Sequence, residues 1–244
     1  MLSSDDGLQQ SKHDDKRRPM ETTAELLTKI RALGKIWHGS GTVPDFVLDR
    51  LAEFLETLRP KVSVETGTGR TTLLFSHLSA NHTVFCVDDR GRFNSYGAVQ
   101  ESELLDPGNT KFVLGPTQST LKNYVFTEPI DFAFLDGPHG YPFLELEYYF
   151  IYPHLRTGAL LVLDDIHIPT IFRTFEFLKE DKMFTLNEVV GNTAMFSRTD
   201  EATFPPLDDG WMSQEFNKKR FPVRWRTRYW RWRFRHLFES DTER

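Results

Sequence analysis

A chain of 244 residues, of which 39% are hydrophobic and 14% aromatic, is sufficient for one large globular domain with appendages. The single cysteine, Cys86, lies in an apolar run and excludes an internal disulfide, as is typical of a reducing compartment. The N-terminus has no basic region followed by an apolar one, and no apolar stretch approaches the roughly 20 residues that span a bilayer. We therefore expect a cytoplasmic protein.

The net charge of −5 is unevenly distributed along the chain. After position 217 there are ten basic and three acidic residues, so the last 27 residues carry +7 and the first 217 carry −12. An acidic body repels polyanions, which argues against nucleic acid as a partner of anything except the C-terminal segment.

The chain divides into four segments. Residues 1–20 are polar and predict a disordered tail, and residues 21–60 predict two helices, one capped by Thr22 or Thr23 and one between Pro44 and Pro60. From 61 to 200, short apolar runs alternate with helical patterns, which is typical of a doubly wound α/β sheet. Residues 201–244 form a basic and aromatic extension.

Seven strands are expected in the core segment, at 62–65, 83–87, 111–114, 130–135, 159–163, 185–190 and 193–197. The helices between them are expected at 71–78, 96–105, 117–124, 143–155 and 170–179. The last two strands are close enough in sequence to form a hairpin. The predicted fold is thus a Rossmann-like, mostly parallel seven-stranded sheet with helices on both faces and an antiparallel final strand.

Three acidic residues follow two of the apolar runs directly. Asp136 ends the fourth predicted strand, and Asp164 and Asp165 end the fifth. Because ligands of open α/β sheets bind beyond the carboxyl ends of the strands, we expect the three carboxylates to meet there. Carboxylates that close repel one another unless a cation or a proton separates them, so they predict a site for a divalent ion.

A glycine-containing turn follows the first predicted strand. Gly67 and Gly69 lie between this strand and a helix, where glycine allows a ligand to approach the backbone and the helix N–H groups. Asp88 ends the next strand, 19 residues after Gly69, where a carboxylate can accept hydrogen bonds from a ribose. Thr72 replaces the third glycine of the dinucleotide fingerprint, and Glu65 precedes the turn, which favours S-adenosylmethionine over a dinucleotide.

Together these motifs resemble the class I S-adenosylmethionine-dependent methyltransferases over residues 45 to 198. Within that class, an acid after the fourth strand and an acidic pair after the fifth are similar to the metal-dependent O-methyltransferases of the catechol and macrocin types. The motifs that carry the resemblance are Glu65-Thr66-Gly67-Thr68-Gly69, Asp88, Asp136-Gly137-Pro138-His139 and the run from Thr157 to Asp165.

The resemblance implies transfer of a methyl group to a hydroxyl of a small molecule or a sugar. It implies that Asp136, Asp164 and Asp165 hold Mg²⁺, and that Asp136 also lines the cofactor site. The remaining cofactor contacts would be Glu65, Thr66, Gly67, Thr68, Gly69 and Asp88. In place of the acid that the family often uses to contact adenine, this chain offers Gln118 or Ser119.

His139 lies where the catechol-type enzymes have a lysine base, three residues after the first metal acid. An imidazole titrates near neutral pH, so we expect His139 to take the proton of the acceptor hydroxyl. Other interpretations stay open: His139 could stabilise a turn, and Asp164 or Asp165 could cap a loop. Asp136, Asp164, His139 and His167 could alternatively bind Fe(II) or Zn²⁺, since imidazole favours those metals.

Two other functions are compatible with the pattern: an NAD(P)-dependent oxidoreductase on the same sheet, and a non-catalytic scaffold that retains the fold. The C-terminal extension could bind a partner, because residues 221–238 interleave arginine with tryptophan and other aromatic residues. Such a segment suits the surface of an inner membrane, a contact with the acidic body or a homo-oligomer interface.

Overall fold

The computed structural model describes residues 22–34, 41–203, 210–211 and 214–222, and the single positions 227 and 231. The predictions for residues 1–20 and for most of 221–238 therefore lie outside the described residues. No helix in the described ranges has the length and apolar character needed to cross a membrane.

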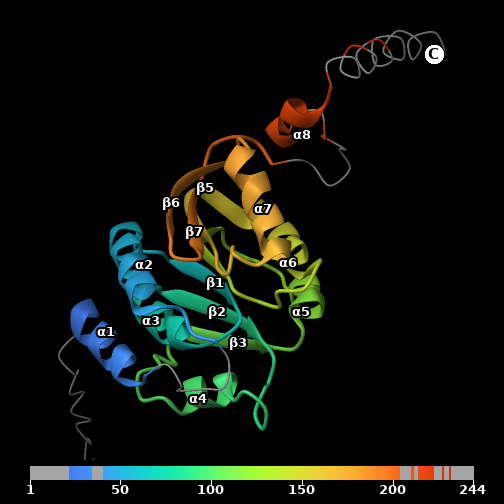
Figure 1. Ribbon diagram of the computed structural model, residues 1–244. Helices are drawn as coiled ribbons and strands as arrows, with labels where there is room; N and C mark the ends of the chain where they lie inside the picture. The colour runs from blue at the N-terminus through green and yellow to red at the C-terminus, as the bar shows by residue number, and fades with distance from the viewer. Residues whose placement is uncertain are drawn as a thin grey trace, which may run out of the picture.

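Seven strands form one sheet in the order β3-β2-β1-β4-β5-β7-β6, which confirms the predicted fold class (Figure 1). The strands are β1 (Val62–Thr66), β2 (Asn81–Cys86), β3 (Thr110–Leu114), β4 (Ile130–Leu135), β5 (Leu155–Leu163), β6 (Phe184–Val190) and β7 (Thr193–Arg198). The first five strands are parallel, whereas β7 lies between β5 and β6 and pairs antiparallel with both.

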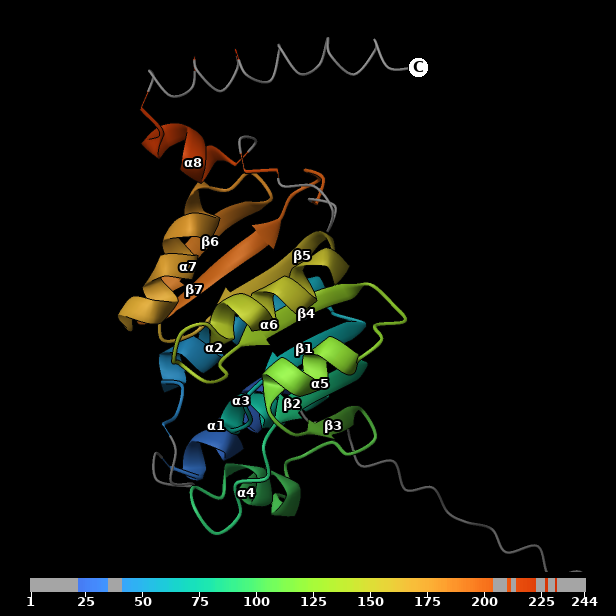
Figure 2. The same ribbon diagram turned by 90° about the vertical axis from the view of Figure 1, so that its right-hand side faces the viewer.

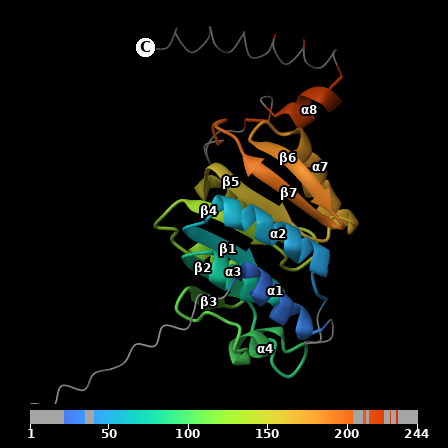
Figure 3. The same ribbon diagram turned by 90° about the vertical axis from the view of Figure 1, so that its left-hand side faces the viewer.

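Helices cover both faces of the sheet. One face is covered by α1 (Thr23–Ala32), α2 (Asp45–Leu58), α3 (Arg70–Leu78) and α4 (Ser95–Glu101), of which α1 to α3 face the viewer in Figure 3. The other is covered by α5 (Thr117–Asn123), α6 (Phe143–Ile151) and α7 (Pro169–Glu180), as Figure 2 shows. A short helix α8 (Glu215–Arg220) packs on α7 through Phe216 and Phe177.

The central strands are apolar throughout because both of their faces are buried. In β4, Ala133 and Leu135 join the core beneath α5 to α7, whereas Phe132 and Phe134 join the core beneath α1 to α3. Alternate side chains of one strand thus belong to different cores, as expected for a parallel sheet covered on both faces.

The N-terminal helices share the core of the sheet. Leu26 and Ile30 of α1 and Leu51 of α2 belong to the same buried cluster as Phe134 of β4. Thr22 caps α1 through a capping box with Glu25, as the sequence predicts for one of its two threonines. The boundary placed at residue 60 stays a prediction, but the segment before it packs directly on the core.

The helix expected at 143–155 ends early. The α-helix stops at Ile151, a 3₁₀ turn (η1, Tyr152–His154) follows, and β5 already begins at Leu155. Pro153 explains the difference, because it has no N–H for the α-helical hydrogen bond and its ring crowds the preceding turn.

The strand order reverses between β1 and β4. From β1 the chain continues outward through β2 to β3, and it then returns to place β4 on the other side of β1. Such a switch point opens a crevice at the carboxyl ends of the strands. The residues after β1, β2, β4 and β5 therefore define the candidate site.

Candidate active site

The turn after β1 lies directly against the end of β4. Gly67 has φ of +88°, and a Cβ added there would lie 2.3 Å from the carbonyl oxygen of Asp136. The backbone N–H of Asp136 donates to the carbonyl oxygen of Thr66 at 3.2 Å and to its Oγ1 at 3.1 Å. Glycine is thus required at position 67 both by its backbone conformation and by the close approach of β4. The glycine turn and the first acid of the predicted metal site are structurally coupled.

Glu65, for which the resemblance implies a cofactor contact, is buried beneath the turn. Its side chain is 1% exposed, and its carboxylate accepts hydrogen bonds from the hydroxyls of Thr71 and Thr72 at 2.5 and 2.8 Å. The imidazole Nε2 of His82 lies 3.1 Å from the same carboxylate. The two hydroxyls and the imidazole hold Glu65 in place, so that it supports the turn from below.

Thr72, which replaces the third glycine of the dinucleotide fingerprint, fixes the turn. Its hydroxyl donates to Glu65, accepts from the backbone N–H of Gly69 at 3.0 Å and lies 3.1 Å from the hydroxyl of Thr68. The substitution therefore connects the turn to the buried carboxylate through one side chain.

Asp88 is exposed after the end of β2 and pairs with Arg90, whose Nε lies 2.8 Å from its carboxylate. This side-chain bond to Arg90 holds the pKa of Asp88 below its ordinary value. The neighbouring Asp89 has a different role: it accepts hydrogen bonds from the backbone N–H groups of Ser95 and Tyr96, both at 2.9 Å, and caps α4. Of the two acids, only Asp88 is exposed to a ligand.

Gln118 and Ser119 lie in the first turn of α5, after the end of β3. Gln118 is half-buried and Ser119 is exposed. Both are therefore located at the same edge of the sheet as Asp88.

Three groups with metal-binding atoms meet after β4 and β5: Asp136, His139 and Asp165. One ligand atom from each lies within 4.8 Å of the other two. The Nε2 atom of His139 is 3.0 Å from Oδ2 of Asp165 and 3.4 Å from Oδ1 of Asp136. The three side chains are 29 to 42% exposed, so solvent and solutes can reach them.

Proton equilibria in this group are strongly shifted. The hydrogen bond to Asp136, and then the one to Asp165, raise the pKa of His139 to about 10. Desolvation raises the pKa of Asp136 to about 7, although the bond to His139 opposes this shift. The pKa of Asp165 is lowered, chiefly by its hydrogen bond to His139. Without a metal ion, the imidazolium of His139 supplies the positive charge between the two carboxylates.

The two acids after β5 have different partners. Asp164 is 8% exposed, and its Oδ1 accepts a hydrogen bond from the hydroxyl of Thr193 on β7 at 2.5 Å. Asp165 has φ of +54°, a left-handed conformation that aspartate tolerates better than most residues. Asp165 reaches His139, whereas Asp164 is bound to the adjacent strand. The group that the structure assembles thus differs from the predicted trio of Asp136, Asp164 and Asp165 by one residue, with His139 in place of Asp164.

Thr170 and His167 contact this group from α7 and from the loop after β5. The hydroxyl of Thr170, at the start of α7, donates to the carbonyl oxygen of His139 at 2.6 Å. His167 places its Nδ1 3.5 Å from Oδ1 of Asp165, the carboxylate oxygen opposite the one that faces His139.

A buried carboxylate beneath the site was not predicted from the sequence. Glu147 of α6 is fully buried, and its Oε2 accepts a hydrogen bond from the hydroxyl of Thr66 at 2.8 Å. A Cβ on Gly137 would lie 2.0 Å from Oε1 of Glu147, so any larger residue there would displace the buried carboxylate. Desolvation raises the pKa of Glu147 to about 7, against the effect of its bonds to Thr117 and Thr66. In sequence, its place in an apolar helical run was the only sign of this burial.

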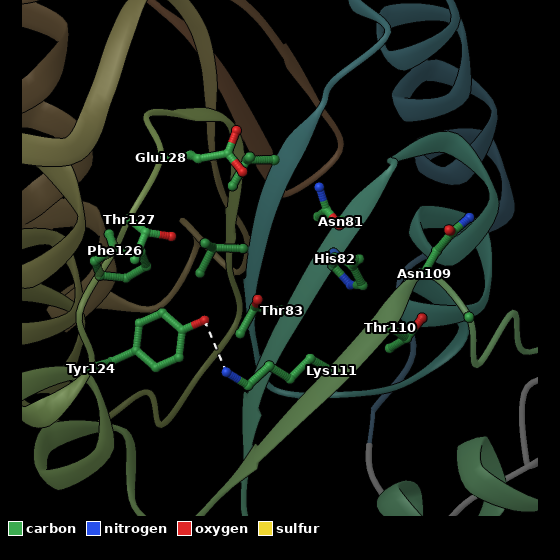
Figure 4. A pocket seen from close by; sticks show the side chains of 13 residues that line it. Asn81, His82, Thr83, Asn109, Thr110, Lys111, Tyr124, Phe126, Thr127 and Glu128 are labelled. Atoms are coloured by element: carbon green, nitrogen blue, oxygen red, sulfur yellow. Dashed lines mark hydrogen bonds between the residues drawn. The ribbon is translucent and has the colours of Figure 1, made fainter.

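A separate groove of about 310 Å³ lies at the opposite edge of the sheet (Figure 4). It is lined by the first residues of β1, β2 and β3 and by the segment before β4. The amino group of Lys111 points toward the hydroxyl of Tyr124 at a distance of 3.5 Å. This groove is at the amino ends of the strands and is therefore distinct from the crevice at the switch point.

Comparison with known proteins agrees with this architecture. Residues 64–166 match a family model described as a methyltransferase domain. No curated protein matches the chain. Among solved structures, the O-methyltransferase TomG of Streptomyces achromogenes, involved in tomaymycin synthesis and solved with S-adenosylmethionine, is 16% identical with a TM-score of 0.56. The match covers 72% of this chain and 90% of TomG.

Two further solved structures contain S-adenosylhomocysteine. The O-methyltransferase of Bacillus cereus is 16% identical, with a TM-score of 0.53 and coverage of 76% of this chain and 94% of that one. A methyltransferase of Podospora anserina is 15% identical, with a TM-score of 0.53 and coverage of 73% and 88%. Residues 64–166 thus match a methyltransferase domain, and the strand order and these likenesses show the class I methyltransferase fold that the sequence resembles.

Proposed function

We propose that the protein transfers a methyl group from S-adenosylmethionine to a hydroxyl of a small molecule or a sugar, with a divalent cation at Asp136, His139 and Asp165. One observation carries the proposal. The glycine turn of the cofactor side lies against the backbone of Asp136, the first acid of the candidate metal group. A methyl donor on the turn and an acceptor oxygen at the acids would therefore be neighbours.

The cofactor side is formed by the turn Thr66-Gly67-Thr68-Gly69, with Asp88 for the ribose hydroxyls and Gln118 or Ser119 for the adenine. S-adenosylmethionine, when bound, supplies an electrophilic methyl group on a sulfonium. Arg90 has to release Asp88 or share it, because the two are paired in the structure. The solved O-methyltransferases with S-adenosylmethionine or S-adenosylhomocysteine support this choice of cofactor and of an oxygen acceptor.

The residues of the candidate metal group fit a divalent cation. They offer two carboxylate oxygens and one imidazole nitrogen, and these atoms lie within 4.8 Å of one another. A divalent cation, when bound, lowers the pKa of a hydroxyl that contacts it. The protein contributes position: Thr170 holds the backbone of His139, and the left-handed turn at Asp165 directs that carboxylate toward the group.

His139 is better suited to hold a cation than to act as the base predicted from the sequence. Its Nε2 atom faces Asp165 at 3.0 Å and Asp136 at 3.4 Å. An imidazole nitrogen that coordinates a cation has no free lone pair, so it cannot also accept the proton of the acceptor hydroxyl. We therefore assign His139 to the metal group.

Calorimetric titration of S-adenosylhomocysteine tests the cofactor assignment. We expect saturable binding to the wild-type protein, weaker binding to Asp88→Ala and no heat with NAD⁺ or NADP⁺. Binding of a dinucleotide in place of S-adenosylhomocysteine would support the oxidoreductase interpretation. If the wild-type protein binds none of these three cofactors, the scaffold interpretation would be supported. Either result would overturn the proposed function.

A further inference from the structure

The candidate metal group mixes nitrogen and oxygen donors, although the acidic residues of the sequence predict oxygen alone. We infer that this site selects a divalent transition metal that accepts an imidazole ligand, such as Mn²⁺, Co²⁺ or Zn²⁺, over Mg²⁺. Its ligands are Asp136, His139 and Asp165, and His167 positions Asp165. The inference rests on the proposed function but concerns the metal and its ligands alone.

The two separations from His139 suit ligands of one ion. Ligand atoms that each lie about 2.1 Å from a metal are about 3.0 Å apart at a right angle and about 3.4 Å apart at the tetrahedral angle. The two separations from Nε2 of His139 are 3.0 Å to Asp165 and 3.4 Å to Asp136. His139 is therefore at a ligand-to-ligand distance from each of the two carboxylates.

Asp164 is the residue that would complete a set of three carboxylates, and it is engaged elsewhere. Its side chain is 8% exposed and accepts a 2.5 Å hydrogen bond from Thr193. Its backbone N–H donates to the carbonyl oxygen of Leu135, which continues the β4–β5 ladder and fixes the residue. Asp164 is accordingly not among the residues whose ligand atoms converge in the structure.

The chemistry of the donors decides between metals. Mg²⁺ is a hard cation that keeps several waters and prefers carboxylate and phosphate oxygens. Imidazole suits later metals such as Zn²⁺ best, and the affinity of a mixed nitrogen and oxygen site for transition metals rises from Mn²⁺ to Co²⁺. Replacing one carboxylate by His139 also removes a negative charge from the site. Both effects lower the affinity for Mg²⁺ more than the affinity for Mn²⁺, Co²⁺ or Zn²⁺.

His167 acts through Asp165. Its Nδ1 lies 3.5 Å from Oδ1 of Asp165, while Oδ2 of the same carboxylate faces His139. A polar or charged neighbour of the second oxygen helps to orient a ligating carboxylate, and loss of such a neighbour lowers metal affinity by about 10- to 100-fold. We assign His167 as a positioning residue.

Electron spin echo spectroscopy of the full chain with Mn²⁺ tests the ligand assignment. We expect one bound Mn²⁺ with ¹⁴N coupling from a coordinated imidazole, replaced by ¹⁵N coupling in protein labelled with ¹⁵N-histidine. His139→Ala should lose the coupling, and His167→Ala should keep it while binding Mn²⁺ about 10-fold more weakly. His77→Ala removes an exposed histidine distant from the site and should behave as wild type.

Competition with Mg²⁺ tests the selectivity. In the wild-type protein, about a 100-fold excess of Mg²⁺ should leave Mn²⁺ bound, whereas in His139→Asp, which restores three carboxylates, the same excess should displace it. Bound Mn²⁺ without nitrogen coupling, displacement by equimolar Mg²⁺, or no metal binding would each overturn the inference. S-adenosylhomocysteine binding, measured separately, shows whether the methyltransferase assignment survives such a result.

Discussion

Two carboxylate–histidine pairs at the sheet have nearly the same distance but different surroundings. Glu65 and His82 lie 3.1 Å apart with at most 1% of either side chain exposed. Asp165 and His139 lie 3.0 Å apart with 31% and 42% exposed. The first pair is surrounded by hydroxyl groups of the protein, and the second faces solvent beside another carboxylate, Asp136. Accessibility, more than the type of residue, separates a structural pair from a candidate site.

The largest expected effect is on the buried pair. Glu65→Ala should lower the free energy of unfolding by about 3–5 kcal/mol, because it leaves His82, Thr71 and Thr72 buried without their acceptor. Chemical denaturation measures this change. Asp88→Ala, which removes an exposed acid, serves as the control and should leave the unfolding free energy unchanged. A Glu65→Ala protein of normal stability that has lost only cofactor affinity would show that Glu65 faces the ligand after all.

A substitution in the exposed pair of Asp165 and His139 should lower metal affinity and leave the unfolding free energy nearly unchanged. Asp165→Asn keeps a residue that tolerates the left-handed backbone, yet it removes the charged ligand. We expect Mn²⁺ affinity to fall by about 100-fold, or about 2.7 kcal/mol, with little change in the unfolding free energy. Calorimetric titration and denaturation of the same sample measure both quantities. Unchanged Mn²⁺ affinity would contradict the assignment of Asp165.

Glu147 lies beneath the candidate metal group, and it should make the unfolding free energy depend on pH. Its pKa is raised to about 7 in the folded protein, so folding favours the protonated form. The folded state then binds more protons than the unfolded state between pH 4.5 and 7. This contribution to stability is fully present below pH 4.5 and is lost as the pH rises through 7.

Glu147→Gln imitates the protonated carboxyl and should remove this dependence. Relative to wild type, we expect the variant to gain about 1–3 kcal/mol of unfolding free energy between pH 5 and pH 8. Denaturation of both proteins at the two pH values measures the difference, in which the contributions of other groups cancel. Parallel stability profiles would show that Glu147 does not titrate in this range.

The smallest expected effect concerns Asp164. Thr193→Val removes the hydroxyl that donates to this buried carboxylate and should cost about 1–2 kcal/mol of unfolding free energy. Mn²⁺ affinity should not change, because Asp164 lies outside the metal group. A large change in Mn²⁺ affinity would place Asp164 among the ligands and weaken the distinction between the two acids after β5.

The fold was predictable because its signals are local. Continuous apolar runs such as Ile130–Leu135 and the spacing of the glycine turn required only the rules for buried strands and strand-to-helix turns. The hairpin at the end followed from the short interval between two runs. Pro153, which shortens the helix before β5, was also readable, but an apolar pattern that continues past it concealed the boundary.

The candidate site was predictable only in part, because the partners of its residues come from distant segments. Position in the sequence could not show that Thr193 on β7 engages Asp164, or that His82 and two threonines enclose Glu65. Nor did it show that the backbone at Asp165 turns its side chain toward His139. Strand-end acids are recognisable by pattern, but their roles depend on these long-range contacts.

The central claim is that a cation bound by the candidate metal group and the methyl group of the cofactor are neighbours at the switch point. It is tested most directly by NMR of S-adenosylmethionine labelled with ¹³C in its methyl group, bound to the protein with and without Mn²⁺. We expect strong paramagnetic relaxation of the methyl signal in the wild-type protein, and we expect this relaxation to be lost in Asp165→Asn. A bound methyl group whose relaxation is the same with and without Mn²⁺ would contradict it.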